Sequence, residues 1–199
     1  PAPTGAAVAS VRVALAARLC APRRCLSRKL PGASDQGVFC ANGADGEAAL
    51  AALEGTGVWA AAGDGARAEA VEKTVLNALL VQVTLAHLSN AMTEAEAGLL
   101  SDNDAAHEWD EGWAYYTGGE ATADAPYGTA DKRGRNYGTT LPDGVTARVN
   151  QEIMAAFVSG LAAMRGSYDA GAAQTAFNTI KQGIQTTYLQ ASLQYARIL

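Results

Sequence analysis

The sequence predicts an all-α protein, a single-domain helical bundle of five or six helices with a long, ordered, Gly-rich loop. Three observations support this prediction. Apolar residues recur at spacings of three and four over several segments. The chain is 49% apolar but only 7% aromatic, and alanine makes up for the missing large side chains, which favours closely packed helices. A length of 199 residues suits one full core, so we expect residues 1–199 to form one domain.

The first third of the chain, residues 1–64, carries two short helical patterns. The first begins after Thr4, which can cap it, and ends at Pro22. The second begins at Asp45 and is stopped by Gly55. A cysteine-bearing segment with several prolines and glycines separates these two helices.

The strongest helical pattern runs over residues 66–92. Its inward stripe contains apolar residues together with Glu69, Glu72 and His87. Polar groups on a buried stripe need partners. We therefore expect these three side chains to face other polar groups or a ligand.

The second half of the chain predicts three helices and one long loop. A helix is expected over 107–116, and two more begin at caps Asp143 and Asp169. The segment Gly118–Gly144 is rich in Gly, Thr and Asp and shows no periodicity. A loop of this length is unusual in a compact domain and is either functional or clamped by side-chain contacts. We expect it to be ordered and to lie against the bundle, where it could cover the functional site.

The three cysteines, Cys20, Cys25 and Cys40, all lie near the start of the chain. Their spacing lacks the paired C-x-x-C pattern of a zinc site, and no histidine lies nearby. One disulfide with one cysteine left over is the preferred interpretation. We favour Cys25–Cys40, because the Pro- and Gly-containing segment between them can close as a loop, and this pairing indicates an oxidising compartment.

The charge and the hydropathy pattern exclude several partners. The net charge is -5 and the basic residues are scattered, which argues against binding to nucleic acid. The longest apolar stretch, Thr74–Met92, is interrupted by polar residues, so we expect no membrane span. Motifs of a nucleophile elbow, a P-loop or a dinucleotide fold are missing, which disfavours a conventional hydrolase or dinucleotide enzyme.

The segment His107–Tyr116 carries the densest set of ionisable groups. On a helix, His107 and Glu111 lie one turn apart, and Asp110 lies three residues from His107, so one imidazole and two carboxylates can converge. Glu108 is expected to point away into solvent. The aromatic residues of this helix that we expect in the core are Trp109, Trp113 and Tyr116.

A hairpin would bring a second histidine to this helix. If the flanking helices run antiparallel about a midpoint near Ala97, His87 pairs with His107, and these are the chain's two histidines. A set made of His87, His107, Asp110 and Glu111 suits iron, zinc or manganese. Metal binding should then weaken as the pH falls, because the ligands must be deprotonated.

Other interpretations of these residues stay open. The helix expected over 107–116 can be an ordinary solvated helix of a structural or interaction module. His87 would then be a core histidine whose ring nitrogens have hydrogen-bond partners within the protein. The same ligands with an open coordination position would suit a metalloenzyme. In the loop, Arg133 and Arg135 are the expected anion contacts, and a packed loop that binds nothing is the alternative.

Three segments resemble the algal Fe-assimilation family, periplasmic proteins of green algae that are induced by low iron or high carbon dioxide. They are HEWDEGWAYYTG at 107–118, YGTADKRGRNYGT at 127–139 and the closing helix QTTYLQASLQYAR at 185–197. The likeness marks His107, Asp110 and Glu111 in the first segment, and Lys132 and Arg133 in the second.

The resemblance implies a periplasmic or secreted helical protein that binds Fe²⁺ or Fe³⁺ outside the cell and assists iron uptake. It also implies a cell-surface iron transporter or reductase as partner, and it implies no enzymatic activity. Nothing in the sequence favours a monomer over a dimer.

Overall fold

A computed structural model describes residues 44–74, 79–119 and 125–197. Most of these residues are helical, and the described part of the chain has no β-strand, so the all-α prediction is confirmed there. One isolated bridge joins Thr140 to Ala147. The helices are α3 (Ala44–Glu54), α4 (Asp64–Lys73), α5 (Leu80–Glu96), α6 (Ala105–Thr117), α7 (Pro126–Tyr137), α8 (Arg148–Met164) and α9 (Ala170–Ala196), with a 3₁₀ turn, η2 (Gly57–Trp59).

The chain divides into two compact units, Pro1–Ala78 and Leu79–Leu199. The described residues of the first unit form α3, η2 and α4, and those of the second form α5 to α9. A single domain over residues 1–199 stays a prediction. The expected helix after Thr4 and the three cysteines, with the Cys25–Cys40 disulfide, lie outside the described residues.

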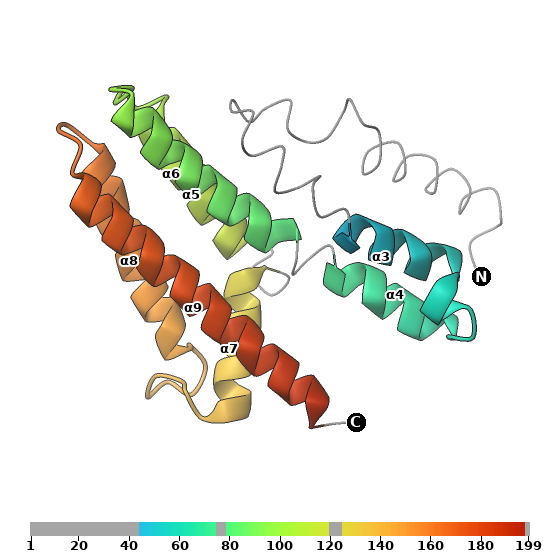
Figure 1. Cartoon of the computed structure of the whole chain (residues 1–199). Helices are drawn as coiled ribbons and strands as arrows, with labels where there is room; N and C mark the ends of the chain where they lie inside the picture. Colours follow the sequence, from blue (N-terminus) through green and yellow to red (C-terminus); the bar gives the residue numbers. More distant parts are fainter. Residues whose placement is uncertain (1–43, 75–78, 120–124, 198–199) are drawn as a thin grey trace. The chain divides into compact units, whose positions relative to one another are not determined.

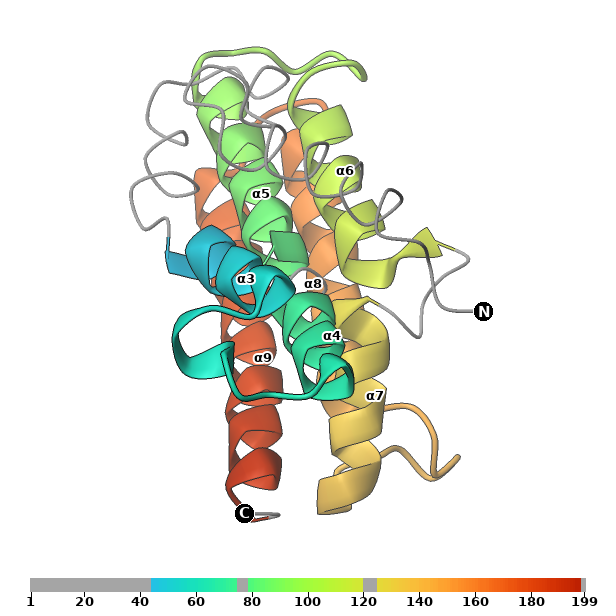
Figure 2. The same ribbon diagram turned by 90° about the vertical axis from the view of Figure 1, so that its right-hand side faces the viewer.

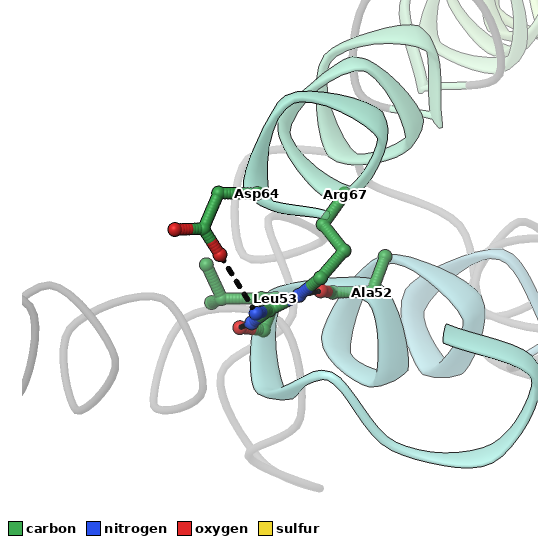
Figure 3. A network of polar contacts seen from close by, with 4 residues as sticks. All are labelled: Ala52, Leu53, Asp64 and Arg67. Atoms are coloured by element: carbon green, nitrogen blue, oxygen red, sulfur yellow. Dashed lines mark hydrogen bonds and ion pairs between the residues drawn. The ribbon is translucent and has the colours of Figure 1, made fainter. Parts of the chain in front are cut away.

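In the first unit, an arginine ties α4 to the end of α3 (Figure 3). Arg67 donates from Nε to the carbonyl oxygen of Ala52 at 2.8 Å and from Nη2 to that of Leu53. These carbonyls lie in the last turn of α3, where a helix leaves its carbonyl groups unpaired. Gly55 ends α3 with a φ of 68°, and a Cβ there would lie 2.9 Å from the guanidinium carbon. Glycine at this position therefore permits the positive φ of the turn and leaves room for the guanidinium of Arg67.

The acidic residues expected on the inward stripe of this region lie on the surface instead. Glu69 and Glu72 are exposed, and both form ion pairs with Lys73, at 3.3 Å and 2.8 Å. None of the described residues of α4 is buried, so this short helix has no continuous core face. Glu69 and Lys73 lie one turn apart on the helix surface, which is the spacing at which side chains on a helix meet.

The second unit is built from two helical hairpins and one extra helix. Helices α5 and α6 pack side by side, as do α8 and α9, and the hairpins meet through α6 with α8 and α5 with α9. Figures 1 and 2 show α7 near the end of this unit opposite the turn between α5 and α6, and α7 contacts α6, α8 and α9. None of the described helices is long and apolar enough to cross a membrane.

Trp109 fixes the crossing of α6 and α8. Its indole Nε1 donates to the carbonyl oxygen of Phe157 at 2.9 Å, and its ring lies against Gly160, where a Cβ would come within 1.9 Å. Trp109 and Tyr116 are buried as expected, but Trp113, which we also expected in the core, is exposed. The largest fully buried side chains of this unit include Leu88, Trp109, Tyr116, Ile153, Met164 and Ile180.

The predicted loop Gly118–Gly144 contains a helix, α7, so the prediction of a segment without periodic structure is wrong over Pro126–Tyr137. This helix begins with proline in its first turn and ends at Gly138, whose φ is 66°. With α7 included, the described residues hold seven α-helices, more than the five or six expected for the whole chain.

A buried polar network joins α7 to α6 and α8. Tyr116 donates to Asn150 Oδ1 at 2.5 Å, and Asn150 Nδ2 donates to Asp131 Oδ1 at 2.7 Å. The same Asp131 oxygen accepts from the backbone N–H of Ala147 at 2.7 Å. Burial raises the pKa of Tyr116 well above its ordinary value, and the charge of Asp131 adds to the effect.

Candidate metal centre

A histidine from α5 meets two glutamates from α6 in the second unit. His87 Nδ1 lies 2.8 Å from Glu108 Oε2 and 3.2 Å from Glu111 Oε2. The side chain of His87 is 7% exposed, that of Glu108 12% and that of Glu111 41%. The three ligand atoms lie within 4.8 Å of one another, which makes this group a candidate metal centre.

The close approach of α5 and α6 depends on a glycine. A Cβ on Gly112 would lie 2.8 Å from Leu88 Cδ2 and 3.3 Å from the carbonyl oxygen of Thr84. Leu88 follows His87 directly, so the absence of a side chain at Gly112 lets the two helices come together at the level of the histidine. Glu108, Glu111 and Gly112 therefore share the side of α6 that faces α5.

The chain's two histidines are joined through one carboxylate. Glu111 turns Oε2 to His87 and places Oε1 3.4 Å from His107 Nε2. His107 is 57% exposed and lies one turn before Glu111 on α6. The structure thus brings His87, His107 and Glu111 together, with His87 buried and His107 at the surface.

Glu108 and Asp110 on α6 have the opposite surroundings to those expected from the sequence. Asp110, an expected ligand, is exposed and is not a member of the three-residue group. The prediction that Glu108 points into solvent is wrong, because Glu108 makes the shortest contact to His87. Each residue turns the helix by about 100°, so Glu108 and Glu111 lie on one side while Asp110 lies well away from their midpoint.

The sequence contained one signal for Glu108 that the prediction missed. Glu108, Glu111, Gly112 and Tyr115 follow the spacing of one helix face. Tyr115 stacks on His87, with ring centroids 5.2 Å apart and planes 13° from parallel. A face that combines a glycine, two acids and an aromatic residue indicates where a partner helix approaches.

Glu94 adds a further carboxylate near the centre. It lies on α5, and its Oε2 is buried without a hydrogen-bond partner. Burial raises its pKa, as do the negative charges of Glu108 and Asp104, while His107 acts in the opposite direction. The end of the helix pair beyond His87 is therefore rich in negative charge.

The arginines expected to contact an anion differ in their surroundings. Arg133 is buried, whereas Arg135 is exposed and donates to the carbonyl oxygen of Val145 at 3.4 Å. Both lie on α7.

Comparison with protein-family models, curated proteins and solved structures finds no match to this chain.

The distances around His87 Nδ1 fit a coordination shell. Metal–ligand bonds near 2.1 Å place neighbouring ligand atoms about 3.0 Å apart in an octahedron and about 3.4 Å apart in a tetrahedron. The contacts of 2.8 Å and 3.2 Å to the two glutamates lie near these values. One imidazole nitrogen and two carboxylate oxygens form a mixed donor set that suits iron, manganese or zinc.

Proposed function

We propose that the protein binds a divalent first-row metal, iron foremost, at His87, Glu108 and Glu111. The observation that carries this proposal is the contact of one buried histidine nitrogen with an oxygen from each of two glutamates. Two carboxylates neutralise the charge of a divalent ion, and the mixed donors suit Fe²⁺ or Mn²⁺ as well as Zn²⁺. Fe³⁺ would also find two of the oxygen ligands that it prefers.

The residues take different parts in this proposal. His87 and Glu108 are the buried ligands, held between α5 and α6. Glu111 is more exposed and also contacts His107, so the ion would enter from that side. Tyr115 covers the imidazole of His87 and fixes its orientation.

The biological role we propose is extracytoplasmic iron binding in iron assimilation. Its support is the resemblance of the 107–118, 127–139 and 185–197 segments to the algal Fe-assimilation family, together with a donor set that suits iron. In this role the protein would deliver iron to a cell-surface transporter or reductase. The proposal is one of binding and transfer, without a catalytic step.

Calorimetric titration of the metal-free full chain with Fe(II) under anaerobic conditions, and with Fe(III), Mn(II) and Zn(II), tests the proposal. We expect saturable binding that Glu108→Gln weakens by about tenfold or more, because even outer partners of metal ligands contribute that much. Asp110→Asn is the matched control: it removes an exposed carboxylate from the same helix and should leave the affinity within about twofold. Absence of saturable binding by every ion would refute the proposal.

The rival is a structural or interaction module without metal. The specific observation in its favour is the 2.8 Å contact of His87 with Glu108, which is also a good hydrogen bond for a buried imidazole. This alternative predicts that Glu108→Gln lowers the free energy of unfolding while the purified wild type contains no metal. Elemental analysis of wild type and variant, alongside urea unfolding, separates the two functions.

A further inference from the structure

Arg133 on α7 is a buried cation without a counter-ion among the described residues. The residue is 5% exposed, and its Nε is buried with no hydrogen-bond partner. The ion pairs found in residues 44–74, 79–119 and 125–197 involve other cations. Burying a charge costs free energy unless the charge is paired, so a group that pairs with this guanidinium would stabilise the fold.

The nearest acid along the helix is already engaged. Asp131 Oδ1 accepts from Asn150 Nδ2 and from the backbone N–H of Ala147, both at 2.7 Å. Two residues along a helix correspond to about 200° of rotation, which places Asp131 on the opposite side of α7 from Arg133. Asp131 therefore belongs to the network with α6 and α8.

A second unsatisfied group lies one turn beyond Arg133. The hydroxyl oxygen of Tyr137 is buried without a hydrogen-bond partner, and residues four apart share one face of a helix. The guanidinium carbon of Arg133 also lies 6.0 Å from the ring centroid of Tyr195 on α9. Arg133 therefore lies where α7 meets the end of α9, and Tyr137 follows it one turn later on the same side of α7.

The hydrogen-bond donors of Arg133 and Tyr137 determine the kind of ligand that would fit. A guanidinium has N–H donors and no acceptor, and a tyrosine hydroxyl can donate as well. Their common partner must accept hydrogen bonds, and the buried positive charge favours an anion. The planar edge of arginine matches two oxygens of a carboxylate or phosphate group.

We propose that Arg133 and Tyr137 form a binding site for a small oxyanion between α7 and the end of α9. The ligand class comprises phosphate, bicarbonate and simple carboxylates, which share oxygen acceptors in a compact, negatively charged group. Arg135 is not part of this site, because it is exposed and contacts the 138–147 segment instead. The proposal is independent of the metal centre, whose three residues lie on α5 and α6.

Calorimetric titration of the metal-free full chain with phosphate, bicarbonate and acetate, each against chloride at equal ionic strength, tests this site. At least one of the three should bind saturably, and the strongest of them identifies the oxyanion. Arg133→Gln should weaken binding by about ten- to a hundredfold, as expected for a charge-assisted contact. Tyr137→Phe removes one hydroxyl and should weaken binding by about three- to tenfold.

Arg135→Gln is the matched control, since it removes the same charge from the same helix at an exposed position; its affinity should stay within about twofold of wild type. Equal weakening by Arg135→Gln and Arg133→Gln would show general charge screening and would overturn the site, as would the absence of saturable binding by all three anions. If Arg133→Gln does not fold, Tyr137→Phe decides alone, and an unchanged affinity in that variant overturns the proposal.

Discussion

At the scale of single residues, the raised pKa of Glu94 makes the stability of the protein depend on pH. Its pKa is raised because burial disfavours the charged form and because Glu108 and Asp104 add negative charge nearby. The folded chain therefore holds the proton of Glu94 at pH values at which the unfolded chain has released it. Ionised Glu94 is then a source of instability in the metal-free protein.

We predict that the free energy of unfolding of the metal-free protein falls as the pH rises from the ordinary glutamate pKa of 4.5 to the raised value of Glu94. In that window the folded state binds more protons than the unfolded state, so stability decreases with pH. Glu94→Gln should remove this part of the decrease. Urea unfolding of both proteins across the window measures it. Glu96→Gln, at an exposed position of the same helix, should retain the wild-type slope.

The residues of the metal centre were partly predictable from the sequence. Antiparallel pairing about a turn places His87 near α6, and the spacing of His107 and Glu111 puts both on one side. Which of Glu108 and Asp110 joins them depends on the rotation of α6 about its own axis. That rotation is set by Gly112 against Leu88 and by Trp109 in the core, contacts that residue spacing alone does not reveal.

At the scale of elements, glycines set how closely the helices cross. Gly160 on α8 accommodates the indole of Trp109, and Gly183 on α9 accommodates Ile153, whose Cδ1 would lie 2.6 Å from an added Cβ. Trp109 is rigid and is held by its hydrogen bond to Phe157, whereas the aliphatic side chain of Ile153 can change its rotamer. The two crossings should therefore differ in their tolerance of a methyl group.

We predict that Gly160→Ala destabilises the fold by about 3 kcal/mol or more, and Gly183→Ala by about 1–2 kcal/mol, because both overpack a helix crossing. Gly171→Ala on α9 is the control, since the added Cβ meets nothing closer than 3.5 Å, and its effect should stay within about 0.5 kcal/mol. Thermal and urea unfolding of the three variants provide the ranking. A cost for Gly171→Ala equal to that for Gly160→Ala would contradict this explanation.

Helix α7 was not predicted, because its composition resembles that of a loop. Its polar and glycine-rich sequence lacks an apolar period, yet proline in its first turn and Gly138 after its end are the usual signals of helix boundaries. Its buried positions include Ala130, Arg133 and Gly134, so it packs mainly through small and polar residues. An apolar pattern cannot detect a helix that is stabilised by hydrogen bonds such as those of Asp131 and Asn150.

At the scale of the whole molecule, the division into two compact units bears on how the chain unfolds. The single-domain prediction expects one calorimetric transition for the full chain, with equal calorimetric and van't Hoff enthalpies. Differential scanning calorimetry of the metal-free chain measures this. Two separate transitions would show that residues 1–78 and 79–199 unfold as independent domains.

The metal-centre residues all lie between 87 and 111, within one hairpin of consecutive helices. Their relative positions are therefore sensitive to changes in chain length within α5 and α6 themselves. Deleting one residue between Glu108 and Glu111 would swing one of these carboxylates by about 100° around α6. Extra residues in the exposed turn at 97–104 would instead leave both helix faces intact. A lineage could thus lengthen its connecting segments freely while keeping the spacing inside α6 constant.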